Sequence, residues 1–162
     1  MQHPHKPTIS EWPGIITAAW DARDSISAQT KGDVREAVNA VLEAVDSGSL
    51  RVAEKGADGW QVNQWVKQAI LLSFRLNPNA IVFGPTDAHG DRAAWFDKVP
   101  LKTTGWSSED CQKAGFRSIP GAFVRRGSFV APGAVLMPSF INIGAYVGEG
   151  TMVDTWSTIG SC

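Results

Sequence analysis

Apolar residues recur at helical spacing in the first half of the chain. One stripe has positions three and four apart, as on one face of a helix: Val34, Ala37, Val38, Val41, Leu42 and Val45. Asp33 followed by Glu36 resembles a capping box, so we expect Asp33 to accept hydrogen bonds from the first turn. Ser47-Gly48 should end this helix. Two more helices are predicted, over residues 15–24 and 63–75.

Shorter elements are predicted around these helices. Residues 50–54 and 60–62 flank a Gly-Ala-Asp-Gly turn at 56–59, a pattern that indicates a β-hairpin. Further along we expect a polar loop over 84–92, a strand over 95–100 and a serine-capped helix over 107–114.

The spacing changes after Arg117, where a bulky apolar residue recurs every six positions: Phe123, Phe129, Val135, Ile141, Val147, Val153 and Ile159. Four positions after each of the first six lies a small residue: Gly127, Gly133, Ser139, Ala145, Thr151 and Ser157. A period of six fits neither a helix nor a flat strand and is typical of a parallel β-helix. Three such units make one coil, so residues 18 apart should stack, Val153 over Val135 and Trp156 over Pro138.

A set of short antiparallel strands is the alternative, because glycine and proline are frequent in this segment. That arrangement gives no reason for a small residue at a fixed place, so the β-helix is favoured. A solenoid needs about three repeats and a capped end. Barely two coils are present and the chain stops three residues after Ile159, so we expect an incomplete protein.

Composition and charge exclude several classes of protein. The 162 residues are 43% hydrophobic and 19% charged, with a net charge of −1, which gives no electrostatic reason to expect nucleic acid or an anionic membrane as partner. No apolar run of about 18 residues predicts a spanning helix, and the N-terminus lacks a secretory signal pattern. The two cysteines, Cys111 and Cys162, suit a reducing cytoplasm, and Cys111 is expected to be a small buried residue.

Few side chains in the repeat region can carry chemistry. Between Gly127 and Cys162 the charged residues are Glu149, at a predicted corner, and Asp154, which follows the inward Val153 and should face outward above Leu136. By position alone, Asp154 is more often an ordinary surface acid than a functional one. The basic candidates near the start of the repeats are Arg117, Arg125 and Arg126, and a surface salt bridge or solvated charge is the preferred reading of the last two. His3, His5 and His89 show no metal-ligand spacing, so no metal is expected.

Several motifs resemble one family, the tetrahydrodipicolinate N-succinyltransferases. They are LRVAEK at 50–55, the helix sequence at 65–75, FDKVP at 96–100, GFR at 115–117, VLMPSFINIGAYV at 135–147 and EGTMVDTWSTIGSC at 149–162. The resemblance runs from about residue 30 to the end. It implies an α+β fold: a helical domain with a hairpin (1–105), a connecting helix and linker (106–120) and the first coils of a left-handed parallel β-helix (121–162).

The resemblance also implies an activity and its residues. Members are cytoplasmic homotrimers of lysine and diaminopimelate biosynthesis that transfer a succinyl group from succinyl-CoA to the amine of 2-amino-6-oxopimelate, with no bound cofactor. Asp154 matches the family's proposed catalytic acid/base, which also contacts the substrate amine, and Arg117 matches an arginine that binds a substrate carboxylate. CoA-binding residues and a further glutamate are expected beyond Cys162, so this chain alone should be inactive.

Two other functions remain possible from the residues. Another hexapeptide acyltransferase, such as an acetyltransferase, would usually need a catalytic histidine, and the repeat region has none. A non-enzymatic β-helix scaffold would need no ligand-binding arginine. A γ-class carbonic anhydrase is excluded because its zinc requires histidine ligands on the helix.

Overall fold

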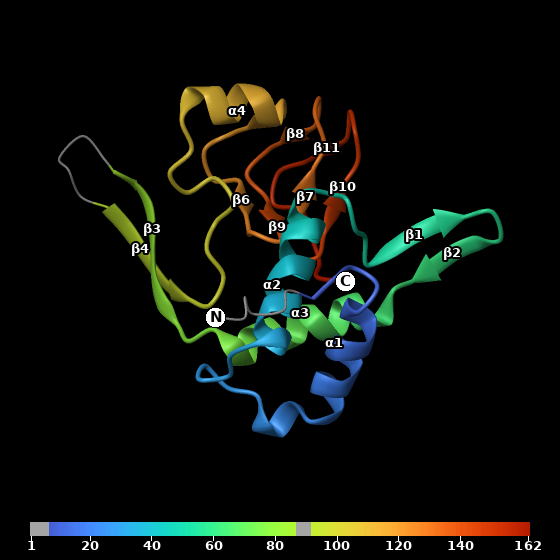
Figure 1. Ribbon diagram of the computed structural model, residues 1–162. Coiled ribbons are helices and arrows are strands. Elements are labelled where there is room, and N and C mark those ends of the chain that lie inside the picture. Colours follow the sequence, from blue (N-terminus) through green and yellow to red (C-terminus); the bar gives the residue numbers. More distant parts are fainter. Residues whose placement is uncertain (1–6, 87–91) are drawn as a thin grey trace. The chain divides into compact units, whose positions relative to one another are not determined.

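The structure is a computed structural model that describes residues 7–86 and 92–162. The chain forms two compact units, residues 1–78 and 79–162, and each is described by itself. The first unit is helical with one hairpin, and the second contains another hairpin, a short helix and a series of two-residue strands (Figure 1).

Three α-helices of the first unit confirm the helical spacing of its sequence. They are α1 (Trp12–Asp21), α2 (Asp33–Asp46) and α3 (Gln64–Leu76), with a short 3-10 turn at Arg23–Ser25. Helix α1 begins three residues earlier than predicted, with a proline in its first turn, where the missing N–H costs no helical hydrogen bond. Helix α2 ends at Asp46 with Ser47 as its C-cap, as expected, and Gly48 follows with a φ of 77°.

The predicted cap of α2 is wrong. Gly32 occupies the N-cap position with no side-chain hydrogen bond, and Asp33 lies inside the first turn together with Glu36. Glycine takes this position because its φ of 74° is costly for other residues. The two carboxylates therefore act on the positive end of the helix dipole rather than as capping acceptors.

The three helices pack against one another around an apolar core. Val34 and Leu42 of the predicted α2 stripe are only half-buried. The fully buried side chains of this core are three residues of that stripe and matching residues of α1 and α3: Ile16, Ala37, Val38, Val41, Val66, Ala69, Ile70 and Leu72. Arg35 joins the ends of this bundle, because its guanidinium donates to the carbonyls of Thr30, Ala28 and Leu76 at 2.7–3.0 Å. The predicted hairpin is confirmed as β1 (Ala53–Gly56) and β2 (Gly59–Val62), paired antiparallel.

The second unit opens with an antiparallel hairpin, β3 (Ala80–Thr86) and β4 (Arg92–Asp97). The predicted polar loop is wrong for residues 84–86, which belong to β3, and its residues 87–91 lie outside the described part of the chain. The predicted strand starts earlier, at Arg92, and ends at Asp97. Helix α4 (Ser108–Ala114) has the expected serine cap: the Ser107 hydroxyl accepts from the Asp110 amide at 3.2 Å, and Asp110 accepts from the Ser107 amide at 2.8 Å.

The rest of this unit consists of parallel strands of two residues each. They are β5 (Arg117–Ser118), β6 (Phe123–Val124), β7 (Phe129–Val130), β8 (Val135–Leu136), β9 (Phe140–Ile141), β10 (Tyr146–Val147), β11 (Met152–Val153) and β12 (Thr158–Ile159). Each pairs with the third strand along, in the orders β11-β8-β5, β12-β9-β6 and β10-β7. Paired residues are 17 or 18 apart, and every pair is parallel. The antiparallel alternative is therefore wrong for these strands.

The identity of the inward residues differs from the prediction by one position in the first part of the repeat. The buried residues of strands β6 to β11 are Val124, Val130, Leu136, Ile141, Val147 and Val153. Phe123, Phe129 and Val135, which were expected to fill the interior, are only half-buried. The spacing of the buried residues is six except between Leu136 and Ile141, where it is five, so the corner at residues 137–139 is one residue short.

This short corner changes the stacking of the predicted site. Val153 pairs with Leu136, and Val135 pairs with Met152, so neither Val153 over Val135 nor Asp154 over Leu136 is correct. The Met137 amide instead donates to the Val153 carbonyl at 2.9 Å, which places Met137 beside the Val153–Asp154 peptide. The predicted stacking of Trp156 on Pro138 is confirmed, since the Trp156 amide donates to the Pro138 carbonyl at 2.6 Å.

Candidate active site

Asp154 follows directly after strand β11 and its side chain is exposed, as predicted for an outward residue. Its Oδ1 accepts from the Thr155 amide at 2.7 Å. Its carbonyl accepts from the Ser157 amide at 3.0 Å, which closes a four-residue turn over 154–157. The turn therefore fixes the direction of the carboxylate and leaves the group within reach of a ligand.

Arg117 opens strand β5, in the same three-stranded sheet as β11. Its backbone is fixed, because its amide donates to the Ala134 carbonyl at 2.9 Å and it pairs with Val135. The side chain is exposed. Since Val135 also pairs with Met152, one column of the sheet runs from Arg117 through Val135 to Met152.

Arg117 and Asp154 lie on the same sheet, formed by β5, β8 and β11, but they are not in direct contact. Asp154 lies two strands across from Arg117 and two residues further along, so their Cα atoms are about 12 Å apart at ordinary strand spacings. An arginine side chain and an extended dicarboxylate can together cover such a gap. The arrangement is thus a guanidinium that can hold a carboxylate and a carboxylate that can hold an amine, on one surface.

The other charged candidates either make contacts within the fold or are exposed. Arg125 is 15% exposed; its Nη2 donates to Asp97 Oδ2 at 2.7 Å and its Nη1 to Asn142 Oδ1 at 2.9 Å. A surface salt bridge or a solvated charge was the preferred reading from the sequence: the salt bridge is confirmed for this residue, but its side chain is mostly buried. Arg126 is exposed, and its amide donates to the Pro100 carbonyl at 2.9 Å. Glu149 is exposed in a turn, as expected of a corner residue.

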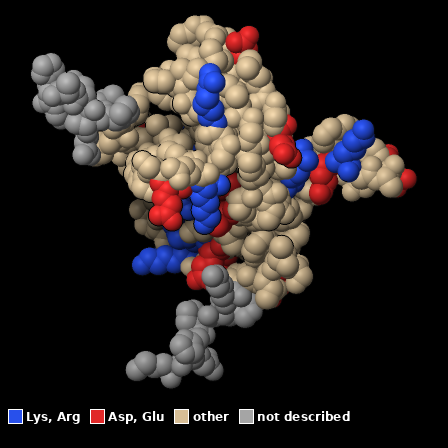
Figure 2. Space-filling model, turned by 90° about the horizontal axis from the view of Figure 1, so that it is seen from above, with Lys and Arg blue, Asp and Glu red and all other residues tan. Residues whose placement is uncertain are grey.

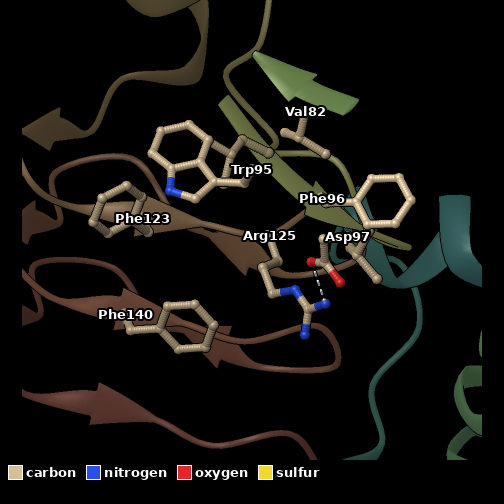
Figure 3. A pocket seen from close by; sticks show the side chains of 9 residues that line it. Val82, Trp95, Phe96, Asp97, Phe123, Arg125 and Phe140 are labelled. Carbon is tan, nitrogen blue, oxygen red and sulfur yellow. Dashed lines mark hydrogen bonds and ion pairs between the residues drawn. The ribbon is translucent and has the colours of Figure 1, made fainter. Parts of the chain in front are cut away.

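The Arg125–Asp97 pair borders a pocket of about 520 Å³ in the second unit (Figure 3). Aromatic side chains from β4, β6 and β9 line it: Trp95, Phe96, Phe123 and Phe140. The Trp95 and Phe123 rings meet edge to face at 5.6 Å. Sequence reasoning missed this pocket, although FDKVP at 96–100 was one of the motifs it singled out. Because the ion pair already occupies the guanidinium, the pocket offers an apolar wall rather than a second carboxylate site.

Cys111 is exposed, so the prediction that it is buried is wrong. The reason is its helix: α4 buries none of its residues. Cys162 is also exposed. His3, His5 and His89 lie outside the described residues. Among residues 7–86 and 92–162, no group of three or more His, Cys, Asp or Glu side chains could hold a metal ion.

The surface charges have mixed sign. In Figure 2, basic and acidic side chains are interspersed over the described part of the face shown. Within that same part of the chain, no helix combines the length and the apolarity needed to cross a bilayer.

The sequence placed Trp156 above Pro138 and indicated no functional role for this residue. It has a φ of 61°, the one positive value among the non-glycine residues that the structure describes. The signal was present in the sequence, because glycine occupies the matching turn position at 121, 127, 133, 144 and 150.

Comparison with known proteins points to one enzyme family. Residues 12–76, which cover the three helices of the first unit, match the family described as "Tetrahydrodipicolinate N-succinyltransferase N-terminal". Curated relatives extend this similarity over most of the chain. A 2,3,4,5-tetrahydropyridine-2,6-dicarboxylate N-succinyltransferase of Paramagnetospirillum magneticum is 61% identical over 148 residues, which is 91% of this chain and 51% of the relative.

Two other relatives carry the same name. The Methylorubrum populi protein is 61% identical over 147 residues, 91% of this chain and 51% of its own length. The Bradyrhizobium diazoefficiens protein is 56% identical over 156 residues, 96% of this chain and 54% of its own length. The chain therefore spans about half the length of the curated relatives it matches.

Proposed function

We propose, on the premise that the chain belongs to the tetrahydrodipicolinate N-succinyltransferase family, that the protein transfers a succinyl group from succinyl-CoA to the amine of 2-amino-6-oxopimelate. This reaction belongs to lysine and diaminopimelate biosynthesis. One observation carries the proposal: 61% identity to a relative of that name over 91% of the chain. The exposed arginine and aspartate of the β5–β8–β11 sheet are chemically suited to it.

The parallel strands would be the first coils of a left-handed parallel β-helix. Parallel pairing at intervals of 17 or 18 residues supports this, because three short sides make one turn of a triangular coil. In functional terms we divide the chain into a helical domain with a hairpin (1–105), a connecting helix and linker (106–120) and the coils (121–162).

Arg117 would bind a carboxylate of the acceptor. A guanidinium offers parallel N–H donors that match the two oxygens of a carboxylate, so it fixes orientation as well as position. Its backbone is fixed in the sheet, and the exposed side chain can reach along the surface toward Asp154. Holding the acceptor in this way lowers the entropy cost of bringing the amine to the thioester.

Asp154 would act as the acid/base on the acceptor amine. The nitrogen lone pair forms a bond to the succinyl carbonyl carbon, the C–S bond breaks, and CoA leaves as its thiol after taking up a proton. That proton comes from the amine, and the Asp154 carboxylate accepts it before passing it on. The hydrogen bond from the Thr155 amide aims the carboxylate for this transfer. No covalent enzyme intermediate is needed, so succinyl-CoA is a co-substrate and no cofactor is bound.

The assembly and its location are part of the same proposal. We expect a cytoplasmic homotrimer with active sites between neighbouring subunits, along the outer faces of the coils. Residues that contact CoA are expected mainly in segments that correspond to the other half of the relatives. The 162 residues alone would then lack a complete active site, which makes them inactive without that half.

The test is a chimera in which residues 1–162 replace the matching half of the Paramagnetospirillum magneticum relative. CoA release from succinyl-CoA is measured with and without 2-aminopimelate as acceptor. We expect release that depends on the acceptor and is far slower from acetyl-CoA. A correctly folded chimera that prefers acetyl-CoA, or that releases no CoA in response to the acceptor, would rule out the proposed function.

A further inference from the structure

Trp156 occupies a backbone position that is built for glycine. The third residue of the comparable turns is Gly121, Gly127, Gly133, Gly144 or Gly150, with φ between 66° and 94°. A side chain at positive φ crowds its own backbone, and a bulky residue there is an outlier. Such strain persists where surrounding structure enforces it, and it is concentrated at functional sites.

Two hydrogen bonds hold Trp156 in this conformation. Its amide donates to the Pro138 carbonyl of the short corner at 2.6 Å, and the Ser157 amide closes the turn on the Asp154 carbonyl at 3.0 Å. Glycine corners make the same bond between coils, as from Gly133 to Gly115. A glycine at position 156 would therefore keep both bonds without the strain, so the backbone alone gives no reason for a tryptophan.

The indole is also exposed. Trp156 has a relative exposure of 81%, higher than any other large apolar residue of the described chain, so its ring contributes little to the core. A rigid aromatic ring with an N–H donor at one edge is a common ligand contact, because it offers a large surface at a small entropy cost. Strain and exposure together indicate a side chain that is kept for what it contacts outside this chain's core.

The position of Trp156 relative to the sheet indicates which substrate its side chain would contact. Arg117 aligns with Met152, Asp154 lies two residues further along the chain, and Trp156 lies two residues further again, in the turn. Trp156 is thus beyond Asp154, on the side away from Arg117. If the acceptor extends from Arg117 to Asp154, the acyl donor has to approach its amine from the opposite side, where the indole lies.

We propose that Trp156 is a binding residue for the acyl donor, with its indole packed against the methylene and amide groups of the thioester-bearing arm of succinyl-CoA. This rests on the proposed function. The indole would hold the arm so that the thioester carbonyl faces the amine at Asp154. The residue would thereby set the affinity for the CoA substrate and not that for the acceptor.

The experiment uses the chimera described above with three variants. Trp156→Gly removes the ring and relieves the positive φ, and Trp156→Phe keeps an aromatic ring. Trp60→Gly removes another exposed tryptophan, from the β1–β2 hairpin. The KM of each substrate is measured, together with CoA binding and 2-aminopimelate binding by calorimetry and the melting temperature.

We expect Trp156→Gly to melt no lower than the unmodified chimera, because glycine tolerates this φ. Its KM for succinyl-CoA and its Kd for CoA should rise about tenfold, with acceptor binding changed less than about twofold. Trp156→Phe should lie closer to the unmodified chimera, and Trp60→Gly should match it. An unchanged Kd for CoA in Trp156→Gly, an equal loss of acceptor binding, or loss of oligomer would each overturn the inference. An unmodified chimera that transfers no succinyl group would instead refute the proposed function.

Discussion

Val153 pairs with Leu136, 17 residues before it in the chain, and both side chains are buried in the core of the second unit. The residue expected in that place, Val135, pairs with the exposed Met152. The layer below the Asp154 turn is therefore built from Leu136, and the short corner at 137–139 lies beside it. This relationship sets which side chains stabilise the site and which ones border it.

Substituting the two neighbours in β8 tests this assignment. Leu136 is fully buried, so Leu136→Ala should lower the free energy of unfolding by about 2–5 kcal/mol. Val135 is half-buried, and Val135→Ala should cost about 1 kcal/mol. Urea unfolding of the two variants measures the difference. Equal losses, or a larger loss from Val135→Ala, would contradict the inward position of Leu136.

Replacing Asp154 by Asn should remove most of the turnover of the chimera. An amide cannot accept the proton of the amine, so kcat should fall by about 100-fold or more. Assembly should be unchanged, because the side chain is exposed and an amide oxygen can still accept from the Thr155 amide. Glu149→Gln is the matched control, since it removes another exposed carboxylate from a turn of the same unit. Normal turnover in Asp154→Asn would refute the acid/base role.

Arg117→Lys should weaken binding of the acceptor and leave binding of succinyl-CoA almost unchanged. Lysine keeps the charge but loses the forked pair of donors, and a charge-assisted hydrogen bond of about 1.5–3 kcal/mol corresponds to a KM increase of roughly 10- to 100-fold. Arg126→Lys, at an exposed position, should change neither KM. Steady-state kinetics with each substrate varied in turn distinguish these outcomes, and an unchanged acceptor KM would remove Arg117 from the site.

The cap of α4 should depend on pH. Hydrogen bonds from the backbone and side chain of Ser107 lower the pKa of Asp110, Lys113 lowers it slightly further, and partial desolvation opposes them. Because the pKa is lower in the folded state, the stabilisation is present above the ordinary value of about 4 and is lost as pH falls through the folded pKa. Titration of the Asp110 carboxyl by NMR should show a midpoint below the ordinary value. Ser107→Ala should raise that midpoint, and an unchanged midpoint would contradict the capping box.

Much of the fold follows from spacing, and the slip in the repeat shows where spacing is insufficient. Each early strand has two adjacent apolar residues, as in Phe123-Val124 and Val135-Leu136, so either member can point inward. Counting back in sixes from Ile141 selects the wrong member, because the corner at Pro138 is one residue short. Local sequence does not reveal such a contraction, since it is determined by the pairing of strands that lie 17 residues apart in the chain.

Only part of the candidate site could be predicted from the sequence. The outward direction of Asp154 follows from its place next to a buried valine, which the period gives correctly after Ile141. The partner of Arg125 does not follow, because Asp97 lies 28 residues away on another strand. The burial expected of Cys111 rested on residue type alone, and a helix without any buried face overrides that preference.

The short corner also matters for protein engineering. A designer who copied residues 121–162 as uniform hexads would turn Phe123, Phe129 and Val135 into the interior and expose Val124, Val130 and Leu136. A single residue inserted next to Pro138 would restore the regular spacing of six. It would also shift the register between strands that pair across residues 137–139. Any consensus sequence, graft or circular permutation of this segment therefore has to keep the number of residues in the corner at 137–139 unchanged.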